Sequence, residues 1–134
     1  MSPDASCKAI GIFDSGVGGL TVFRAVAERM PREHIVYLGD TARVPYGTKS
    51  PEIVTQYARA CARLLLERGV KLMVVACNTA SAFGLGALQS ELPVPVIGVI
   101  EPGAQRAASL SRGGRIGVVG TAGTISSGQY QEAL

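Results

Sequence analysis

The sequence predicts an α/β fold in which a doubly wound, mainly parallel sheet is flanked by helices. Five short apolar runs rich in Val and Ile recur along the chain, and stretches with helical spacing separate them. Short runs that do not alternate with polar residues are typical of strands buried on both faces, which belong to parallel sheets. The runs expected to form strands are Ala9 to Phe13, Ile35 to Leu38, Val70 to Ala76, Val94 to Ile100 and Arg115 to Val119.

The clearest helix is expected from Pro51 to Arg68. Ser50 can cap its first turn, proline suits the first helical position, and Gly69 ends the element. Apolar side chains within it keep a spacing of about 3.6 residues, so one face is expected to pack against a core. Weaker helices are expected at Gly19 to Arg29, Ser81 to Glu91 and Pro102 to Leu110, with another opening near Ser126.

Length and composition indicate one globular domain over residues 1–134, without an internal linker or repeat. Apolar residues make up 47% of the chain and charged residues 17%, which argues against disorder. The formal net charge is only +3, and the basic residues are scattered rather than clustered with aromatic ones. We therefore expect no nucleic-acid partner. No apolar run approaches the roughly 20 residues that span a bilayer, so no membrane association is expected either.

The cysteines bear on location and on metal binding. Cys7, Cys61 and Cys77 cannot all pair with one another, and none lies in a Cys-x-x-Cys or Cys/His cluster typical of zinc sites. The first residues also lack the basic start and apolar run of a signal peptide. We expect no metal site and a reducing, cytoplasmic location.

Candidate functional residues follow the strands, because ligands of open parallel sheets bind beyond the carboxyl ends of the strands. Cys77 directly follows the third run and precedes a helix, whose N–H groups and dipole favour a thiolate. The alternative is a small buried hydrophobe, as most cysteines are. That alternative suits Cys61, on an apolar helix stripe, better than Cys77, whose neighbours are polar. Cys77 is therefore the expected reactive thiol.

The loop after the first run begins with Asp14 and is rich in glycine. Glycines can bring backbone N–H groups up to an anion, but the dinucleotide pattern needs a glycine where Thr21 stands, and the Gly-Lys-Ser/Thr of a P-loop is absent. The aspartate also resembles the nucleophile of phosphoaspartate hydrolases, although Gly16 replaces their second aspartate. On this segment alone, a helix-capping turn and a functional carboxylate are equally good interpretations of Asp14.

Two further loops are expected at the same edge of the sheet. The long loop from Gly39 to Gly47 presents Tyr46 either as a lid over a ligand or as a packing residue. Asp40 and Arg43, in the same loop, can form a local ion pair. The turn from Gly120 to Thr124 offers hydroxyls and N–H groups to a carboxylate or phosphate, or is an ordinary connection between elements.

Together these loops supply a carboxylate, a thiol, hydroxyls and backbone N–H groups, without a Ser/His/Asp set or a nucleotide loop. Such a set suits a small amino acid, with the thiolate as general base for a weakly acidic proton. No lysine lies in a context that suggests a pyridoxal Schiff base, and we expect no cofactor.

Four segments resemble the glutamate racemases of the aspartate/glutamate racemase family, in the family's order and spacing over nearly the whole chain from Ile10. They are Phe13-Asp14-Ser15-Gly16-Val17-Gly18-Gly19-Leu20-Thr21, Tyr37-Leu38-Gly39-Asp40 through Pro45-Tyr46-Gly47, Ala76-Cys77-Asn78-Thr79-Ala80-Ser81, and Pro95-Val96-Ile97-Gly98-Val99-Ile100-Glu101-Pro102.

The resemblance implies a flavodoxin-like racemase domain, the N-terminal half of an enzyme that interconverts L- and D-glutamate without a cofactor. Such an enzyme supplies D-glutamate for peptidoglycan in the bacterial cell wall. By the same resemblance, Cys77 and Asp14 are catalytic. The implied substrate-binding residues are Asp14, Ser15, Pro45, Tyr46, Gly47, Asn78, Thr79, Thr121 and Thr124.

One departure from the family matters for activity. The family uses two cysteines on opposite faces of the α-carbon, the second in a Gly-Cys-Thr-His segment of a second α/β domain, and nothing after Cys77 supplies it. We therefore expect the chain to fold but not to racemise appreciably without that second domain as partner. The alternatives are an aspartate racemase-like enzyme and a non-catalytic, truncated binding domain. The oligomeric state is left open, with a homodimer as one candidate.

Overall fold

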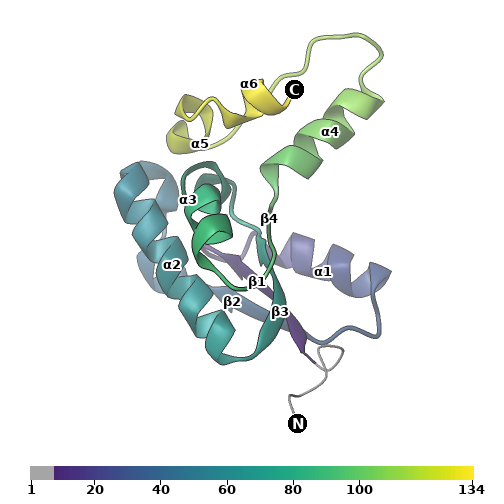
Figure 1. The fold of residues 1–134 in the computed structure, drawn as a ribbon. Helices are drawn as coiled ribbons and strands as arrows, with labels where there is room; N and C mark the ends of the chain where they lie inside the picture. Colours follow the sequence, from purple (N-terminus) through teal and green to yellow (C-terminus); the bar gives the residue numbers. More distant parts are fainter. Residues whose placement is uncertain (1–7) are drawn as a thin grey trace.

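The computed structural model describes residues 8–134 and has a four-stranded, all-parallel sheet at its centre (Figure 1). The strands lie in the order β2-β1-β3-β4. This arrangement confirms the α/β class and the parallel sheet. The strand bounds are β1 Ala9–Asp14, β2 Ile35–Gly39, β3 Val70–Val75 and β4 Val96–Gly98.

Helices cover both faces of the sheet, as expected for a doubly wound fold. Helix α1 (Leu20–Arg29) lies on one face, where Val22 and Val26 pack against a buried cluster that includes Ile12. Helices α2 (Pro51–Glu67) and α3 (Asn78–Glu91) pack against each other on the opposite face (Figure 1). The larger core lies beneath these two helices.

Helix α2 forms as its sequence predicts. Ser50 caps it by accepting a hydrogen bond from the backbone N–H of Ile53 at 3.4 Å, and Pro51 occupies the first helical position. After the helix, Gly69 adopts φ +72°, a left-handed conformation that L side chains rarely adopt. The apolar stripe of the helix is buried against the sheet, with Cys61 1% exposed among its residues.

The prediction of a fifth strand from Arg115 to Val119 was wrong. Within residues 8–134 this run pairs with no strand, and the side chain of Val119 is fully exposed. Helix α4 (Ile100–Leu110) begins almost directly after β4 and leads the chain away from that edge of the sheet (Figure 1). A strand is stabilised by its neighbours, so an apolar run without a partner stays extended but unpaired.

Several element bounds also differ from those expected. Helix α3 begins at Asn78 rather than Ser81, and β4 is only three residues long because α4 starts at Ile100. The helix expected to open near Ser126 is instead two short helices, α5 (Ala122–Ser126) and α6 (Gln129–Ala133), which Gly128 separates at φ +74°. Cys7 lies outside the described residues. None of the helices found between residues 8 and 134 is long and apolar enough to cross a membrane.

Candidate active site

A cavity of about 800 Å³ lies at the carboxyl ends of β1 and β3, the two central strands. The chain leaves β1 toward α1 on one face of the sheet and leaves β3 toward α3 on the other (Figure 1). The loops diverge at this point, which is where open α/β sheets bind their ligands. The cavity is lined by the Asp14 loop, the Cys77 loop, and residues 116–121 from the unpaired segment.

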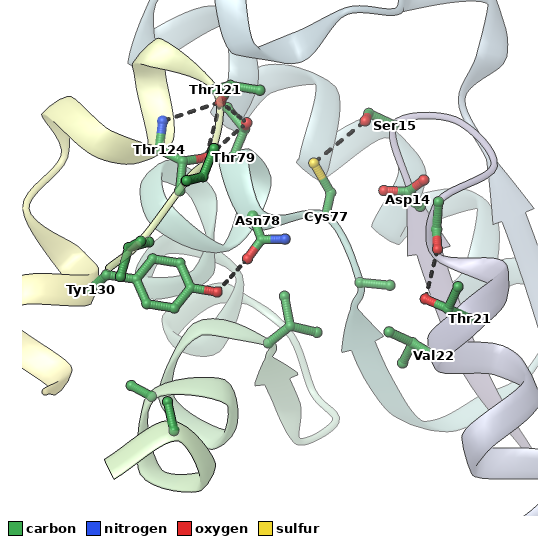
Figure 2. Close-up of a pocket in the computed structure, with 18 of the residues that line it drawn as sticks. Asp14, Ser15, Thr21, Val22, Cys77, Asn78, Thr79, Thr121, Thr124 and Tyr130 are labelled. Atoms are coloured by element: carbon green, nitrogen blue, oxygen red, sulfur yellow. Dashed lines mark hydrogen bonds between the residues drawn. The ribbon is translucent and has the colours of Figure 1, made fainter. Parts of the chain in front are cut away.

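Cys77 stands at the N-terminus of α3, facing the cavity. Its Sγ accepts a hydrogen bond from the backbone N–H of Ala80 at 3.4 Å, and the thiol donates to Oγ of Ser15 at 3.5 Å (Figure 2). The side chain is 5% exposed. Contacts from the Asp14 loop and from the first turn of α3 therefore hold the sulfur in the cavity wall, next to the core cluster to which Cys77 also belongs, and its reactivity stays a prediction.

Asp14 forms the turn before α1 that one of its two interpretations expects, and it also lines the cavity. Its Oδ2 accepts hydrogen bonds from the backbone N–H groups of Gly16 (3.0 Å) and Gly19 (3.1 Å), which fix the turn into α1. Within the described chain, no protein donor reaches Oδ1 of Asp14. The hydroxyl of Tyr37 on β2 donates to the carbonyl of Gly16 at 3.0 Å and braces the same loop. One oxygen thus organises the loop, and a contact of the other with a substrate stays a prediction.

Three threonine hydroxyls form a closed cluster on the opposite wall. The Oγ1 atoms of Thr79, Thr121 and Thr124 lie 2.9, 3.2 and 3.0 Å apart (Figure 2). Thr121 also caps α5 by accepting from the backbone N–H of Thr124 at 3.3 Å. The structure therefore brings together hydroxyls that are 42 and 45 residues apart in sequence. Hydroxyls that donate within such a cluster can redirect their protons to a carboxylate.

The loop that carries Tyr46 packs against this cluster on the side away from the cavity. The Tyr46 side chain is 1% exposed, and its hydroxyl donates to Asp40, which also pairs with Arg43 at 2.6 Å. Burial and the bond to Asp40 raise the pKa of Tyr46 well above its usual value. The structure shows Tyr46 as a buried packing residue rather than as a lid. A contact between Tyr46 and a substrate stays a prediction.

Gly47 is the part of this loop that approaches the cavity wall most closely. A Cβ placed on Gly47 would lie 2.4 Å from Cβ of Thr121, so only glycine allows the loop to approach this closely. The side chains of Pro45 and Tyr46 are not part of the cavity lining, which on this side is formed by Thr121 and Thr124. The loop therefore acts on the site by supporting Thr121.

Residues 10–134 match the model of the Asp/Glu/Hydantoin racemase family. The chain belongs to this family. It is 62% identical to the glutamate racemase of Geobacter metallireducens over 127 residues, which are 95% of this chain and 47% of that protein. The chain thus spans about half the length of the curated relatives that it matches.

Solved racemase structures share the fold described above. The glutamate racemase from Aquifex pyrophilus superposes with a TM-score of 0.91 at 55% identity, over 93% of this chain and 50% of that one. The Francisella tularensis glutamate racemase, solved in complex with D-glutamate, gives a TM-score of 0.85 at 39% identity, over 95% of this chain and 48% of that one. These likenesses confirm the glutamate racemase resemblance that the sequence motifs carry.

Tyr130 is a polar residue of the cavity lining that the sequence did not indicate. Tyr130 on α6 lines the cavity, and its hydroxyl donates to Oδ1 of Asn78 at 2.7 Å (Figure 2). Burial raises the pKa of Tyr130 above its usual value. No local pattern marks this tyrosine, because its position depends on the break at Gly128 and on the packing of α6 against α4.

Most of the predicted site residues lie around one cavity, although their roles toward a substrate stay predictions. Its lining includes Asp14, Ser15, Cys77, Asn78, Thr79, Thr121 and Thr124. Among residues 8–134, no three His, Cys, Asp or Glu side chains are grouped so that they could hold a metal ion.

Proposed function

We propose that the chain supplies one half of a glutamate racemase active site, in which Cys77 is one of the two thiol bases that move the α-proton. The observation that carries this proposal is the position of the Cys77 sulfur. It lies at the C-terminal edge of the sheet, between the Asp14 loop and α3, in the wall of the one cavity that also holds the three threonine hydroxyls. The similarity to glutamate racemases supports glutamate as the substrate.

The proposed reaction begins with the thiolate form of Cys77. Its sulfur takes the α-proton of glutamate, so that an S–H bond forms while the C–H bond breaks, and the electron pair passes to the α-carbon and its carboxylate. A proton delivered from the opposite face then gives the other enantiomer. Hydrogen bonds from Thr79, Thr121 and Thr124 would hold carboxylate oxygens, and the free oxygen of Asp14 would hold the ammonium group and assist proton transfer.

The proposal assigns the opposite face to a second thiol, which the remaining half of a racemase would supply. Cys61 does not fill this role, because it is buried beneath α2, where its sulfur contacts Tyr46 and Asp40. Burial raises the pKa of the Cys61 thiol, which keeps it in the unreactive neutral form. The whole enzyme would act in the cytoplasm and supply D-glutamate for peptidoglycan.

Complementation in trans tests the proposal. The 134-residue chain would be mixed with the remaining half of the Geobacter metallireducens racemase, and interconversion of L- and D-glutamate followed by circular dichroism. We expect racemisation only when both parts are present, and none when the chain carries Cys77→Ala. Activity with Cys77→Ala equal to that of the unsubstituted chain would refute the role of this thiol. Aspartate in place of glutamate tests the aspartate racemase-like alternative.

A further inference from the structure

Tyr130 and Asn78 form a contact that crosses one end of the cavity. The hydroxyl of Tyr130, on α6, donates to Oδ1 of Asn78 at an O–O distance of 2.7 Å (Figure 2). Asn78 is the first residue of α3 and directly follows Cys77. The two residues are 52 positions apart, so this bond ties the last helix of the chain to the loop that carries the thiol.

This bond decides which end of the amide faces a ligand. A side-chain amide carries an oxygen that accepts hydrogen bonds and an NH₂ group that donates two. Because Tyr130 occupies Oδ1, the nitrogen of Asn78 is turned away from the phenol, toward the side on which Cys77 lies (Figure 2). Asn78 therefore offers donors to the cavity, and these suit an anionic oxygen rather than an ammonium group.

The contact itself shows the hydroxyl of Tyr130 as the donor, with Oδ1 of Asn78 as the acceptor. The ring is half-buried, and burial raises the pKa of the phenol above its usual value, so the proton that it donates is retained at neutral pH. Helix α6 packs against α4, so the position of the ring does not depend on the hydrogen bond alone. The hydroxyl lies only 3.7 Å from where a Cβ on Gly103 of α4 would stand.

We propose that Tyr130 is a positioning residue that fixes the amide of Asn78 with its NH₂ group toward Cys77, so that Asn78 binds a carboxylate oxygen of the amino acid. The inference rests on the proposed function, because glutamate is the ligand that Asn78 would select. It adds to that function a residue from α6 and a chemical reason for the orientation of the substrate.

A double-mutant cycle tests whether Tyr130 acts through Asn78. Dissociation constants for L- and D-glutamate would be measured by NMR titration of the ¹⁵N-labelled 134-residue chain carrying Tyr130→Phe, Asn78→Ala or both. Loss of one hydrogen bond should weaken binding about threefold to tenfold in Tyr130→Phe. In the Asn78→Ala background, Tyr130→Phe should not change the dissociation constant of glutamate any further. The same loss in both backgrounds would overturn the proposal.

The substitution Asn78→Asp tests the direction in which the amide points. Aspartate keeps an oxygen for Tyr130 but replaces the NH₂ group by a second carboxylate oxygen of similar size. We expect glutamate to bind at least tenfold more weakly, because two carboxylates would face each other. Binding that is unchanged or tighter would mean that residue 78 faces the ammonium group, and the proposal would be wrong.

A measurement without ligand separates this inference from the proposed function. If complementation in trans gives no racemisation, the proposed function of the chain fails, while the orientation of Asn78 can still be examined without ligand. Tyr130→Phe should increase the mobility of the Asn78 NH₂ group in ¹⁵N relaxation. The matched control is Tyr57→Phe on α2, whose ring packs against Arg43 outside the cavity and which should have no such effect. Unchanged mobility in Tyr130→Phe would overturn the inference.

Discussion

Substituting Gly47 tests whether the Tyr46 loop supports the threonine cluster. A Cβ at residue 47 would lie 2.4 Å from Cβ, 2.5 Å from Cγ2 and 2.8 Å from Oγ1 of Thr121. All three distances are shorter than real Cβ contacts, so Gly47→Ala must displace Thr121 by roughly 1 Å, a movement on the scale at which overpacking is felt. Thr121 would then lose its hydrogen bonds to Thr79 and Thr124.

The expected cost follows from these contacts. Overpacking of a well-packed site costs about 1–3 kcal/mol, and loss of the threonine cap of α5 adds about 1 kcal/mol. Movement of the short helix α5 would relieve part of the strain. We therefore expect Gly47→Ala to lower the free energy of unfolding by about 2 kcal/mol.

The assay is urea unfolding, with Gly86→Ala as the matched control. Gly86 lies in α3, and a Cβ placed there meets nothing within 4 Å. Alanine there should raise the free energy of unfolding by about 0.5–1 kcal/mol, because glycine is the weaker helix former. A Gly47→Ala chain as stable as the unsubstituted one would refute the close packing of the loop against Thr121.

Three further predictions concern pH and the Asp14 loop. Because the pKa of Tyr46 is raised, its contribution to stability is complete below about pH 10 and declines above it, as the unfolded chain ionises. Tyr46→Phe should therefore have a lower free energy of unfolding than the unsubstituted chain at pH 7. In urea unfolding at pH 11, this difference in free energy between the two chains should be smaller by about 1.4 kcal/mol. A difference that stays constant between pH 7 and pH 11 would contradict this. The pKa of Glu91 is lowered by its hydrogen bond to Arg59, so the effect of Glu91→Gln on stability should be present at pH 6 and vanish as the pH falls below the folded-state pKa. An effect that persists at pH 2 would rule the ion pair out as its cause. Tyr37→Phe removes the hydrogen bond to the carbonyl of Gly16 and should speed amide hydrogen exchange in residues 15–19, with exchange in α2 as the internal control.

The parts of the fold that could be predicted from the sequence are those that local signals determine. Helix α2 has a cap at Ser50, a proline at its first position and a glycine shortly after its end at Gly69, and each acts as expected. The position of Cys77 also follows from local order, because a strand, a thiol and a helix occur in succession. The parallel sheet then brings that loop next to the Asp14 loop.

The parts that could not be predicted depend on partners distant in sequence. The run from Arg115 to Val119 has the composition of a strand, but no neighbouring strand lies beside it within residues 8–134. The sequence alone does not decide whether Tyr46 is a lid or a packing residue, because its burial depends on contacts with Asp40 in the same loop and with Cys61 on α2. Tyr130 reaches the site only through the packing of α6 on α4, which no sequence pattern marks.

The most direct test of the central claim is exchange of the α-hydrogen of glutamate in deuterated water, followed by NMR for each enantiomer separately. A single thiol at one face should exchange the hydrogen of one enantiomer without inverting it, and Cys77→Ala should abolish that exchange. Exchange that survives Cys77→Ala, or the absence of exchange with either enantiomer, would contradict the claim that Cys77 is the base of a working half-site.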